Sequence, residues 1–310
     1  MADIVVVGSL NIDFVVKVPR RPLPGETLTG YSFEVIPGGK GANQAVAASK
    51  LNGKVSMVGR IGDDVFSQVL RNSLLQAGVD IRGVKVTKGV STGTAFITVD
   101  ETGENTIIVI PGANKLCTPL DVDAVEEIIS KAKVLLLQLE IPLETVCYAA
   151  SMAHRYGATV ILDPAPAQSL PQELYQLVDI ITPNEREAET LTGYQVESLE
   201  KAELAALALI ERGVKKAILK LGSRGGLLVT EEERFYAPAY QVNALDTTAA
   251  GDAFAGGLAV ALAEGKDLKE AIIFANAVGA LAVTRIGAQT SMPARGEVEE
   301  FITTAVIKAG

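Results

Sequence analysis

The sequence predicts an α/β fold with a doubly wound, mainly parallel central sheet flanked by helices, together with a small β-sheet lid. Three observations support this prediction. Apolar runs of strand length alternate with helix-length segments along most of the 310 residues. Hydrophobic residues make up 48% of the chain, which is enough for a sizeable core. Two stretches in which apolar and polar residues alternate with period 2 interrupt this succession of strand-length and helix-length segments. We expect residues 1–310 to form one domain of this kind.

The strands of the predicted sheet are short β-rich runs, at Ile4–Val7, Val55–Ile61, Val134–Leu139, Thr159–Leu162, Ile180–Thr182 and Ala217–Leu221. Segments with the helical period lie mostly between or after them, and several are followed by glycine. These predicted helices are Asn43–Leu51, Val65–Ala77, Leu120–Ala132, Leu143–Tyr156, Lys201–Arg212, Gly251–Ala263 and Leu268–Val283. Together they could cover both faces of the sheet.

The two interrupting stretches are Ile12–Ile36 and Thr92–Ile110, which carry turn residues such as Pro24, Gly25 and Gly103. Neither stretch could form a stable sheet alone, because an isolated hairpin is marginal in water. We therefore predict that they combine into a lid, formed by about residues 12–36 and 92–110 and inserted into the α/β body.

Composition excludes several classes of function. The net charge is −9, with 28 Lys and Arg against 37 Asp and Glu, which argues against nucleic acid as a partner. His154 is the only histidine, and Cys117 and Cys147 are the only cysteines, so neither a zinc cluster nor a Ser-His-Asp triad is expected. Free thiols and the lack of a signal-like or membrane-spanning run predict a cytoplasmic protein with no membrane contact.

The main functional pattern is a small-residue turn that runs from Thr247 to Gly251 and ends in Asp252 as an apolar helix begins. Small residues allow a ligand to approach the backbone, and the first N–H groups of a helix attract anions. Asp252 could accept a proton beside a bound phosphate. The alternative is an ordinary helix start, with Asp246 or Thr247 as the cap and Asp252 as an acid that compensates the helix dipole.

Three further segments predict a pocket for a polyhydroxylated ligand. Asn11 and Asp13 follow the first strand and share one face if the chain is extended. The stretch from Pro37 to Gln44 holds three glycines with Lys40 and Asn43. An ordinary strand-to-helix turn capped by Asn43 would show the same sequence pattern. Glu140 follows a buried run, at the sheet edge where ligands bind in open α/β folds, but it could instead be a helix-capping acid.

Three more segments could hold phosphates or cations. Asn184 and Glu187 share one side of a helical turn and could hold Mg²⁺ through water, but a capping box has the same spacing. The loop from Lys220 to Gly226 could lie against phosphates or ribose, or be a simple hairpin turn. The segment from Thr284 to Ser291 offers the carbonyl and hydroxyl oxygens that a monovalent cation needs.

Taken in order, these elements resemble the phosphofructokinase-B-type (ribokinase-like) sugar kinases over essentially the whole chain. Two signatures carry the resemblance, Gly38-Gly39-Lys40-Gly41-Ala42-Asn43-Gln44 and Asp246-Thr247-Thr248-Ala249-Ala250-Gly251-Asp252. Many members have glycine where Ala249 stands, and alanine there is usual in the members that phosphorylate ribose. The resemblance therefore implies D-ribose and ATP as substrates, Mg²⁺ and K⁺ as cofactors, and a homodimer formed through the lid.

The resemblance also implies roles for individual residues. Asp252 would be the general base, and the backbone of Ala249, Ala250 and Gly251 would form an anion hole. The residues that the resemblance implies as ligand contacts fall into four groups. Ribose would be bound by Asn11, Asp13, Gly39, Lys40, Gly41, Asn43, Glu140 and Asp252. ATP would contact Asn184, Lys220, Leu221, Gly222, Ser223, Arg224, Gly225, Gly251, Asp252 and Asn276. K⁺ would be bound by Asp246, Thr248, Ala282, Arg285, Gly287 and Ser291, and Mg²⁺ would be organised through water by Asn184 and Glu187.

Two other functions remain open at this point. A kinase of the same fold could act on fructose, 2-deoxyribose or another small polyol. A nucleoside is a less suitable substrate, because its base needs an aromatic side chain to stack on and few of the 15 Phe and Tyr residues are candidates. A sugar sensor without catalysis could keep the pocket, although an intact Asp252 argues against it.

Overall fold

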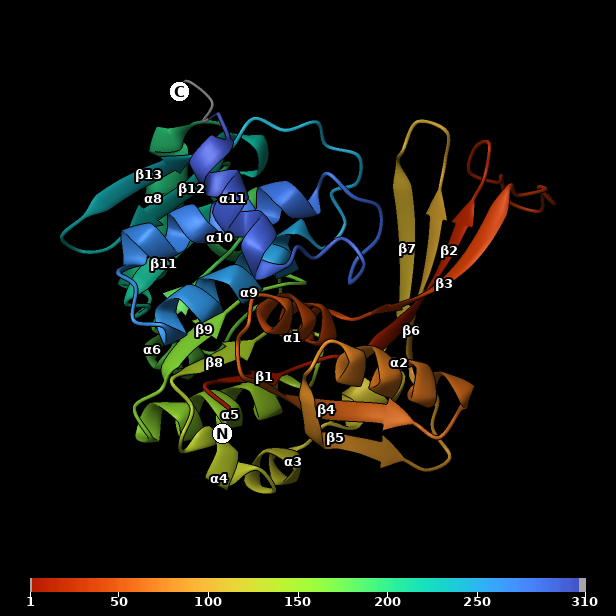
Figure 1. Cartoon of the computed structure of the whole chain (residues 1–310), viewed down its shortest axis with the longest axis horizontal. Helices are drawn as coiled ribbons and strands as arrows, with labels where there is room; N and C mark the ends of the chain where they lie inside the picture. Colours follow the sequence, from red (N-terminus) through yellow and green to blue (C-terminus); the bar gives the residue numbers. More distant parts are fainter. Residues whose placement is uncertain (1, 307–310) are drawn as a thin grey trace.

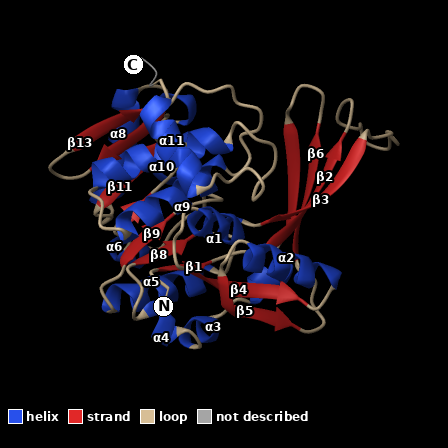
Figure 2. Ribbon diagram, in the orientation of Figure 1, coloured by secondary structure: helices blue, strands red, loops and turns tan. Residues whose placement is uncertain are grey.

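Nine strands form the main sheet of the computed structural model, which describes residues 2–306 (Figures 1 and 2). Their order across the sheet is β13 (Arg234–Pro238), β12 (Gly225–Val229), β11 (Lys216–Lys220), β10 (Ile180–Ile181), β9 (Thr159–Leu162), β8 (Val134–Leu137), β1 (Ile4–Val7), β4 (Val55–Gly62) and β5 (Asp80–Thr87). Every pair from β11 to β5 is parallel, and only the edge pairs β11–β12 and β12–β13 are antiparallel. The predicted mainly parallel sheet is confirmed.

Helices cover both faces of this sheet, because the strands are apolar on both sides. Ile4 and Val6 of β1 belong to one core, and Val5 and Val7 belong to the other. The first core packs against α1 (Lys40–Lys50), α2 (Val65–Gln76), α9 (Ala250–Ala263), α10 (Leu268–Ala282) and α11 (Arg295–Thr304). The second packs against α3 (Pro119–Asp123), α4 (Glu126–Ile129), α5 (Leu143–Arg155), α6 (Gln172–Leu177), α7 (Glu185–Thr192) and α8 (Leu199–Glu211).

Two helix predictions differ from the structure. The single helix expected over Leu120–Ala132 is wrong: α3 and α4 are separate, because Val125 leaves the helical conformation with φ −124° and ψ 17°. The helix expected to start at Asn43 begins three residues earlier, with Gly39 in the N-cap position. Asn43 therefore lies in the first turn of α1, where its side chain is free to contact another element. The strands β5, β12 and β13 were not among the predicted runs: polar residues interrupt the apolar pattern of β5, β12 begins with two glycines, and the apolar run of β13 is short and ends in proline.

A second, smaller sheet projects from the body beside α2 (Figure 1). Its strands lie in the order β3 (Ser32–Gly38), β2 (Asn11–Lys17), β6 (Gly93–Val99) and β7 (Asn105–Ile110). These strands come from the two stretches predicted for the lid, and β2 and β6 join them through a parallel pair. Phe14 of β2 contacts Phe66 of α2 with ring centroids 5.3 Å apart, so α2 supports the base of the small sheet.

The connections after β1, β8, β9 and β11 all leave the carboxyl edge of the main sheet, where ligands bind in open α/β folds. The chain first enters the small sheet at Asn11 and leaves it at Gly38, which is followed by α1, and it forms the other two strands from Gly93 to Ile110. Residues from the small sheet and from the main sheet can therefore meet at this edge.

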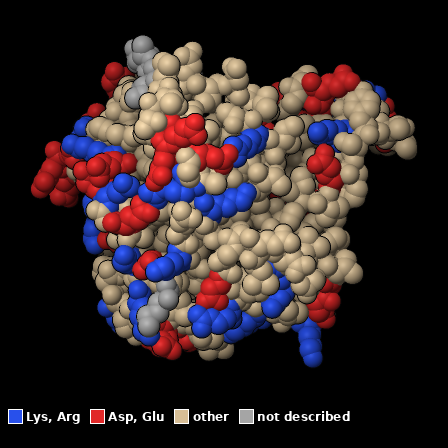
Figure 3. All heavy atoms as spheres, viewed as in Figure 1, with Lys and Arg blue, Asp and Glu red and all other residues tan. Residues whose placement is uncertain are grey.

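Charged side chains of both signs are interspersed over the face of the molecule seen in Figure 3. Acidic residues gather at the turn between β12 and β13, which contains Glu231, Glu232 and Glu233. Among residues 2–306, no helix is long and apolar enough to cross a membrane.

Candidate functional site

The N-terminus of α9 is the centre of the candidate site. Its N-cap, Ala249, has left-handed backbone angles of φ 57° and ψ 13°, a conformation that glycine adopts without strain and alanine does not. Glycine would therefore be the less strained residue at this position. Of the three residues predicted to form the anion hole, Ala250 is the one whose N–H is already engaged, because it donates to the carbonyl of Thr247 (3.3 Å).

Asp252, in the first turn of α9, is 5% exposed and is held by two amides from α1. Asn43 Nδ2 donates to Oδ2 (3.0 Å), and Gln44 Nε2 donates to Oδ1 (3.1 Å). Burial raises the pKa of Asp252 to about 6, and the nearby Asp163 adds to this effect, while Lys40 and the two amides oppose it. The group is therefore ionised near neutral pH and still basic enough to accept a proton.

Carboxylates surround the half-buried ammonium group of Lys40. Burial alone would lower its pKa, but the negative charges of Asp252, Glu140, Asp163 and Glu187 raise it overall, so Lys40 stays protonated. This cation thus lies among the predicted sugar residues and the predicted nucleotide residues.

Asp13 and Glu140 both lie close to the start of α1. Burial raises the pKa of Asp13 to about 7, and the charges of Glu140 and Asp252 contribute to this shift while Lys40 opposes it. Glu140 accepts hydrogen bonds from the hydroxyl of Ser9 and from the backbone N–H of Lys40 (3.1 Å). The structure therefore brings both predicted sugar-binding carboxylates to the helix start.

Asn11 is 3% exposed and is oriented by a residue that the sequence analysis did not identify. Asn114, in the short 3₁₀ helix Gly112–Leu116, donates to Asn11 Oδ1 (2.7 Å). Asn114 also pairs with the backbone of Leu10, accepting from its N–H (2.9 Å) and donating to its carbonyl (3.1 Å). The side-chain oxygen of Asn11 is engaged, which leaves its amide hydrogens for a ligand.

The glycines at the end of β3 make room for these side chains. A Cβ on Gly38 would overlap the carboxylate of Asp13, and a Cβ on Gly39 would lie 2.6 Å from the backbone nitrogen of Asn11. Gly39 also has φ 88°, where other residues are strained. Gly41 is equally close to the backbone of Gly8 and Ser9. Asn43 Oδ1 is buried without a hydrogen-bond partner, as expected of an atom that awaits a ligand hydroxyl.

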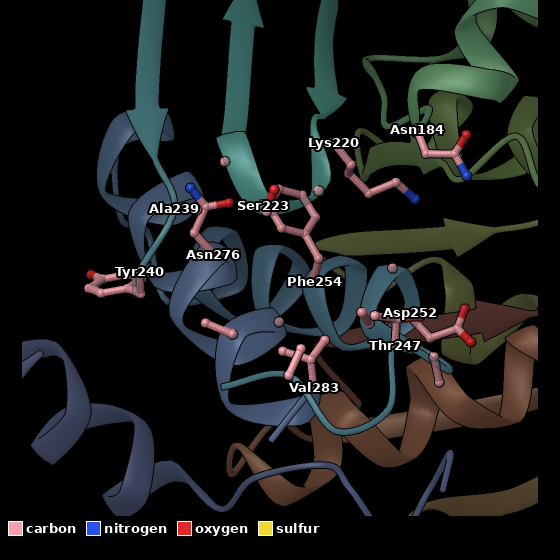
Figure 4. A pocket seen from close by; sticks show the side chains of 18 of the residues that line it. Asn184, Lys220, Ser223, Ala239, Tyr240, Thr247, Asp252, Phe254, Asn276 and Val283 are labelled. Carbon is pink, nitrogen blue, oxygen red and sulfur yellow. The ribbon is translucent and has the colours of Figure 1, made fainter. Parts of the chain in front are cut away.

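A cavity of about 450 Å³ extends from Asp252 along the N-terminal end of α9. Asp252, Lys220 and Asn184 lie at one end of it, and Tyr240 and Asn276 lie at the other (Figure 4). Its wall includes many of the predicted nucleotide-binding residues, namely Asn184, Lys220, Gly222, Ser223, Gly225, Gly251, Asp252 and Asn276. Lys40 also lines it, whereas Asn11, Asp13, Gly39, Gly41, Asn43 and Glu140 do not, so the predicted sugar residues form an adjoining group.

Two residues predicted to contact the nucleotide point elsewhere. Leu221 is 1% exposed and belongs to the apolar core beneath the loop. The guanidinium of Arg224 forms an ion pair with Glu185 and donates to the carbonyl of Val196 (3.1 Å). Neither side chain lines the cavity, so any contact with a nucleotide would come from their backbone.

Asn184 and Glu187 form the capping box of α7. Asn184 Oδ1 accepts from the N–H of Glu187 (2.8 Å), and Glu187 accepts from the N–H of Asn184 (2.7 Å). Both nevertheless line the cavity. Burial raises the pKa of Glu187, while Lys220 lowers it. The residues 2–306 contain no cluster of three or more His, Cys, Asp or Glu side chains placed to hold a metal ion. The donors at Asn184 and Glu187 suit Mg²⁺ that keeps most of its other ligands as water and phosphate.

The predicted potassium residues meet where two loops join. The Asp246 carboxylate accepts from the N–H of Thr248 and from the N–H of Gly287 (both 2.9 Å), and these bonds hold its pKa low against the effect of burial. Arg285 instead pairs its side chain with Glu297, and the hydroxyl of Ser291 donates to the carbonyl of Ala288 (2.8 Å). Ala282 is buried nearby at the end of α10. The hydrogen bonds of Asp246 therefore connect it with Thr248 and Gly287, and a carboxylate with the carbonyl oxygens of these loops is a donor set that a hard monovalent cation could use.

The site also contains buried polar residues that sequence reasoning missed. Asp163, which directly follows β9, is 1% exposed and forms an ion pair with Lys220 (2.6 Å). Its position at the carboxyl edge of a buried strand is the same signal that identified Glu140. Gln44 ends the glycine-rich signature but was given no role, and Gln138 gave no local signal, because only the packing of α1 against β8 brings the two amides together.

Comparison with known proteins agrees with this geometry. The profile of the pfkB family carbohydrate kinases matches residues 1–295. The chain is 43% identical over 300 residues to a ribokinase of Haemophilus influenzae, covering 97% of this chain and 98% of that one. It is 38% identical over 302 residues to a deoxyribokinase of Salmonella typhi, covering 97% and 99% of the two chains.

Solved structures show the same relationship. The structure of an Arabidopsis thaliana ribokinase in complex with ribose and ATP superposes with a TM-score of 0.90 at 35% sequence identity, covering 97% of this chain and 99% of the other.

Proposed function

This chain belongs to the pfkB family of carbohydrate kinases, and we propose that it transfers the γ-phosphoryl group of ATP to the 5-hydroxyl of D-ribose, giving D-ribose 5-phosphate and ADP. The observation that carries the proposal is the place of Asp252. Its buried carboxylate lies at a helix N-terminus, between the polar group around Asp13 and a cavity lined by the residues expected for ATP.

In the proposed reaction Asp252 takes the proton from the 5-hydroxyl, and the hydroxyl oxygen forms a bond to the γ-phosphorus. The bond from that phosphorus to the bridging oxygen of ADP breaks, so the phosphoryl group changes partner and ADP leaves with the electron pair. Such a transfer depends mainly on positioning and on neutralising the charge of the phosphoryl oxygens. The N–H of Gly251 and the ammonium groups of Lys40 and Lys220 can supply that neutralisation.

We propose that ribose lies against Asn11, Asp13, Lys40, Asn43 and Glu140. The unpaired Asn43 oxygen and the free amide hydrogens of Asn11 support this proposal, because vicinal hydroxyls need both donors and acceptors. ATP would occupy the 450 Å³ cavity, with its phosphates toward Gly251 and its base toward Tyr240 and Asn276.

Mg²⁺ bound with the nucleotide would neutralise phosphate charge, and we propose Asn184 and Glu187 as the side chains that organise it through water. We propose that K⁺ lies between the loops joined by Asp246, with Thr248, Ala282, Arg285, Gly287 and Ser291 contributing largely backbone oxygens. Asp246 bonds both to the turn that precedes α9 and to Gly287, so a cation there would brace the anion-binding turn.

We propose that the small sheet acts as a lid over the sugar. It carries Asn11 and Asp13 to the site, and it joins the body at four points of the chain, near Asn11, Gly38, Gly93 and Ile110. Closure would exclude water, which otherwise competes with ribose for the phosphoryl group.

A homodimer through the small sheet is also proposed, because its strand β7 is an edge strand with four consecutive exposed apolar residues, Ile107 to Ile110. Exposed apolar edges of this kind are usually covered in native proteins. Use of ATP, and two cysteines that form no disulfide, support a cytoplasmic location.

A deoxyribose kinase is the second candidate, because deoxyribokinases are similar over the full length of the chain. The two sugars differ by one hydroxyl. A site that hydrogen-bonds that hydroxyl would discriminate strongly, since the analogue would leave buried polar groups unpaired.

The test is ADP release measured with ATP and Mg²⁺ in the presence of ribose, 2-deoxyribose, fructose or adenosine at matched concentrations, first with K⁺ and then with Na⁺ in its place. The proposal predicts the highest kcat/KM for ribose and activation by K⁺. A preference for another sugar would refute the substrate but retain the phosphoryl-transfer mechanism. Binding of ribose without ADP release would indicate a sugar sensor.

A further inference from the structure

Three buried polar side chains, Gln138, Gln44 and Asp163, lie behind the reacting groups and have no part in the mechanism so far. Gln44 of α1 is fully buried, and its single Nε2 atom donates both to Asp252 Oδ1 (3.1 Å) and to Asp163 Oδ2 (2.9 Å). An amide nitrogen carries two hydrogens, so one hydrogen is available for each carboxylate. The amide therefore separates two acidic groups that would otherwise repel each other.

A second amide fixes the orientation of the first. Gln138, which follows β8, donates from Nε2 to Gln44 Oε1 (2.6 Å) and is fully buried. Gly8 at the end of β1 leaves the space for it, because a Cβ on Gly8 would overlap Gln138 Oε1. With its oxygen engaged by Gln138, Gln44 can only present hydrogens to Asp163 and Asp252.

Asp163, the last of these three side chains, connects them to the phosphate side of the site. Asp163 Oδ1 pairs with Lys220 Nζ (2.6 Å), and a Cβ built on Gly251 would lie 3.2 Å from that same ammonium nitrogen. Lys220 therefore faces the helix N-terminus from the end of β11, between Asn184 and Asp252 (Figure 4). The order of contacts is Gln138, Gln44, Asp163, Lys220, with Asp252 bonded to Gln44.

We propose that Gln44 and Asp163 are positioning residues for phosphoryl transfer: Gln44 holds the carboxylate of Asp252 toward the sugar hydroxyl, and Asp163 holds the ammonium group of Lys220 toward the transferred phosphoryl group. This inference rests on the proposed kinase function and deepens it. It links the proton acceptor and a phosphate-neutralising cation through one amide, so that both are placed by the packing of α1 against the carboxyl edge of the sheet.

Electrostatics gives the proposal a measurable consequence. The charged groups that face Asp252 come from several elements, and they are Lys40 of α1, Asp13 of β2, Asp163 after β9 and Lys220 of β11. Burial is the main cause of the raised pKa of Asp252, and Asp163 is the charge that raises it further. A change of charge at position 44 or 163 should therefore move the pH at which Asp252 loses its proton.

Two isosteric substitutions should shift this pH in opposite directions. Gln44→Glu replaces the bridging donor by a third carboxylate. In the profile of single-turnover phosphorylation rate against pH, the fall at low pH, here called the acid limb, should therefore move at least one pH unit higher. The rate of this variant at pH 7 should fall roughly 100-fold with the KM for ribose changed less than about threefold. Asp163→Asn removes a negative charge, so the acid limb should move to lower pH. The rate on the plateau above the acid limb should fall about tenfold, because Lys220 loses its ion pair with Asp163.

The control is Gln68→Glu, the same substitution on the exposed surface of α2, which should leave both the rate and the acid limb as in the wild type. Acid limbs that coincide with that of the wild type in both variants would overturn the inference while the proposed function stands. Should Gln44→Glu fail to fold, as judged by circular dichroism, an unshifted limb in Asp163→Asn alone would overturn it. A wild-type chain without turnover would refute the proposed function itself.

Discussion

At the scale of single residues, Asp252 is the group on which the proposed reaction depends most directly. Replacing it with Asn keeps the shape of the side chain but removes the proton acceptor. Positioned acid-base groups contribute roughly 10²- to 10⁴-fold. We expect Asp252→Asn to lower kcat about 1000-fold or more in the ADP-release assay, with ribose affinity by isothermal titration calorimetry changed only a few fold. A variant that turns over like the wild type would refute the role of Asp252.

The same substitution should stabilise the protein at neutral and alkaline pH. The pKa of Asp252 is about 6 in the folded state against 3.8 for an ordinary Asp, so folding penalises the ionised form. The penalty is complete above pH 6, declines between pH 6 and 3.8, and is absent below 3.8. We expect Asp252→Asn to raise the free energy of unfolding at pH 8 by up to about 3 kcal/mol, because one pKa unit corresponds to about 1.4 kcal/mol.

At pH 4 the two proteins should unfold almost equally, which thermal and urea denaturation can measure. Asn43 can accommodate the new amide, because its own oxygen has no partner and a rotated Asn43 could accept from Asn at position 252. Equal stability of variant and wild type at pH 8 would contradict the proposed desolvation of Asp252.

Asn114 provides another prediction at this scale. It is not among the residues proposed to contact ribose or ATP, but it orients Asn11, which is proposed to contact ribose. Its removal leaves the Asn11 oxygen and the backbone of Leu10 without partners. We expect Asn114→Ala to raise the KM for ribose at least tenfold, with kcat and the KM for ATP changed less than threefold. Steady-state kinetics would test this, and a larger effect on ATP than on ribose would argue against the placement of the sugar.

At the scale of elements, the site depends on how closely α1 and α9 approach. Gly256 makes this approach possible, because a Cβ there would lie 2.7 Å from Cβ of Ala47 and 2.9 Å from the backbone nitrogen of Ala48. Asn43 and Gln44 are on the same helix as those two alanines, and Asp252 is one turn before Gly256. The register of this helix pair therefore sets the hydrogen bonds to Asp252.

We expect Gly256→Ala to cost about 1 to 3 kcal/mol of unfolding free energy, as is usual for an overpacked core, and to lower kcat by displacing Asp252. Gly296→Ala in α11 is the matched control, since a Cβ there meets nothing within 4 Å and alanine favours the helix. The control should be as stable as the wild type or slightly more stable. Similar melting temperatures for the two variants would show that α1 and α9 can separate without cost.

At the scale of the whole molecule, the small sheet leaves apolar surface that the fold itself does not cover. Ile108 of β7 is 63% exposed, and Phe96 on the neighbouring strand β6 and Phe33 on the opposite edge strand β3 are also exposed. A monomer rarely keeps apolar patches of this kind without a purpose. Pairing of two small sheets would bury them and would also tie the lid of one subunit to that of its partner.

We expect Ile108→Lys to convert the proposed homodimer into a monomer, measured by size-exclusion chromatography with light scattering at micromolar concentration. Leu120→Lys is the control, because Leu120 is 72% exposed on α3, an element of the main body, and its replacement should leave the dimer intact. A wild-type protein that elutes as a monomer would refute the dimer proposal before any variant is made.

Much of the architecture could be predicted from the sequence, because it depends on local patterns. Runs such as Ile4–Val7 and Val134–Leu137 are apolar on both faces, which indicates parallel strands covered by helices on each side. The two stretches with period 2 were likewise enough to predict the separate small sheet. The polar residues after β1 and β8 indicated the ligand edge, since the carboxyl ends of parallel strands share that edge.

Only the tertiary structure decided which buried polar residues serve the site. Gln44 bonds to residues 94, 119 and 208 positions away, and Asn114 bonds to a residue 103 positions away. Gln44 lies in the glycine-rich signature, but nothing local indicates which residues it contacts, and no local pattern distinguishes Asn114 from an ordinary turn residue. The sequence by itself determined the alternation of strands and helices, because hydrophobic period is a property of neighbouring residues. The tertiary structure decided the contacts to Asp252, because hydrogen bonding depends on distance in space and not along the chain.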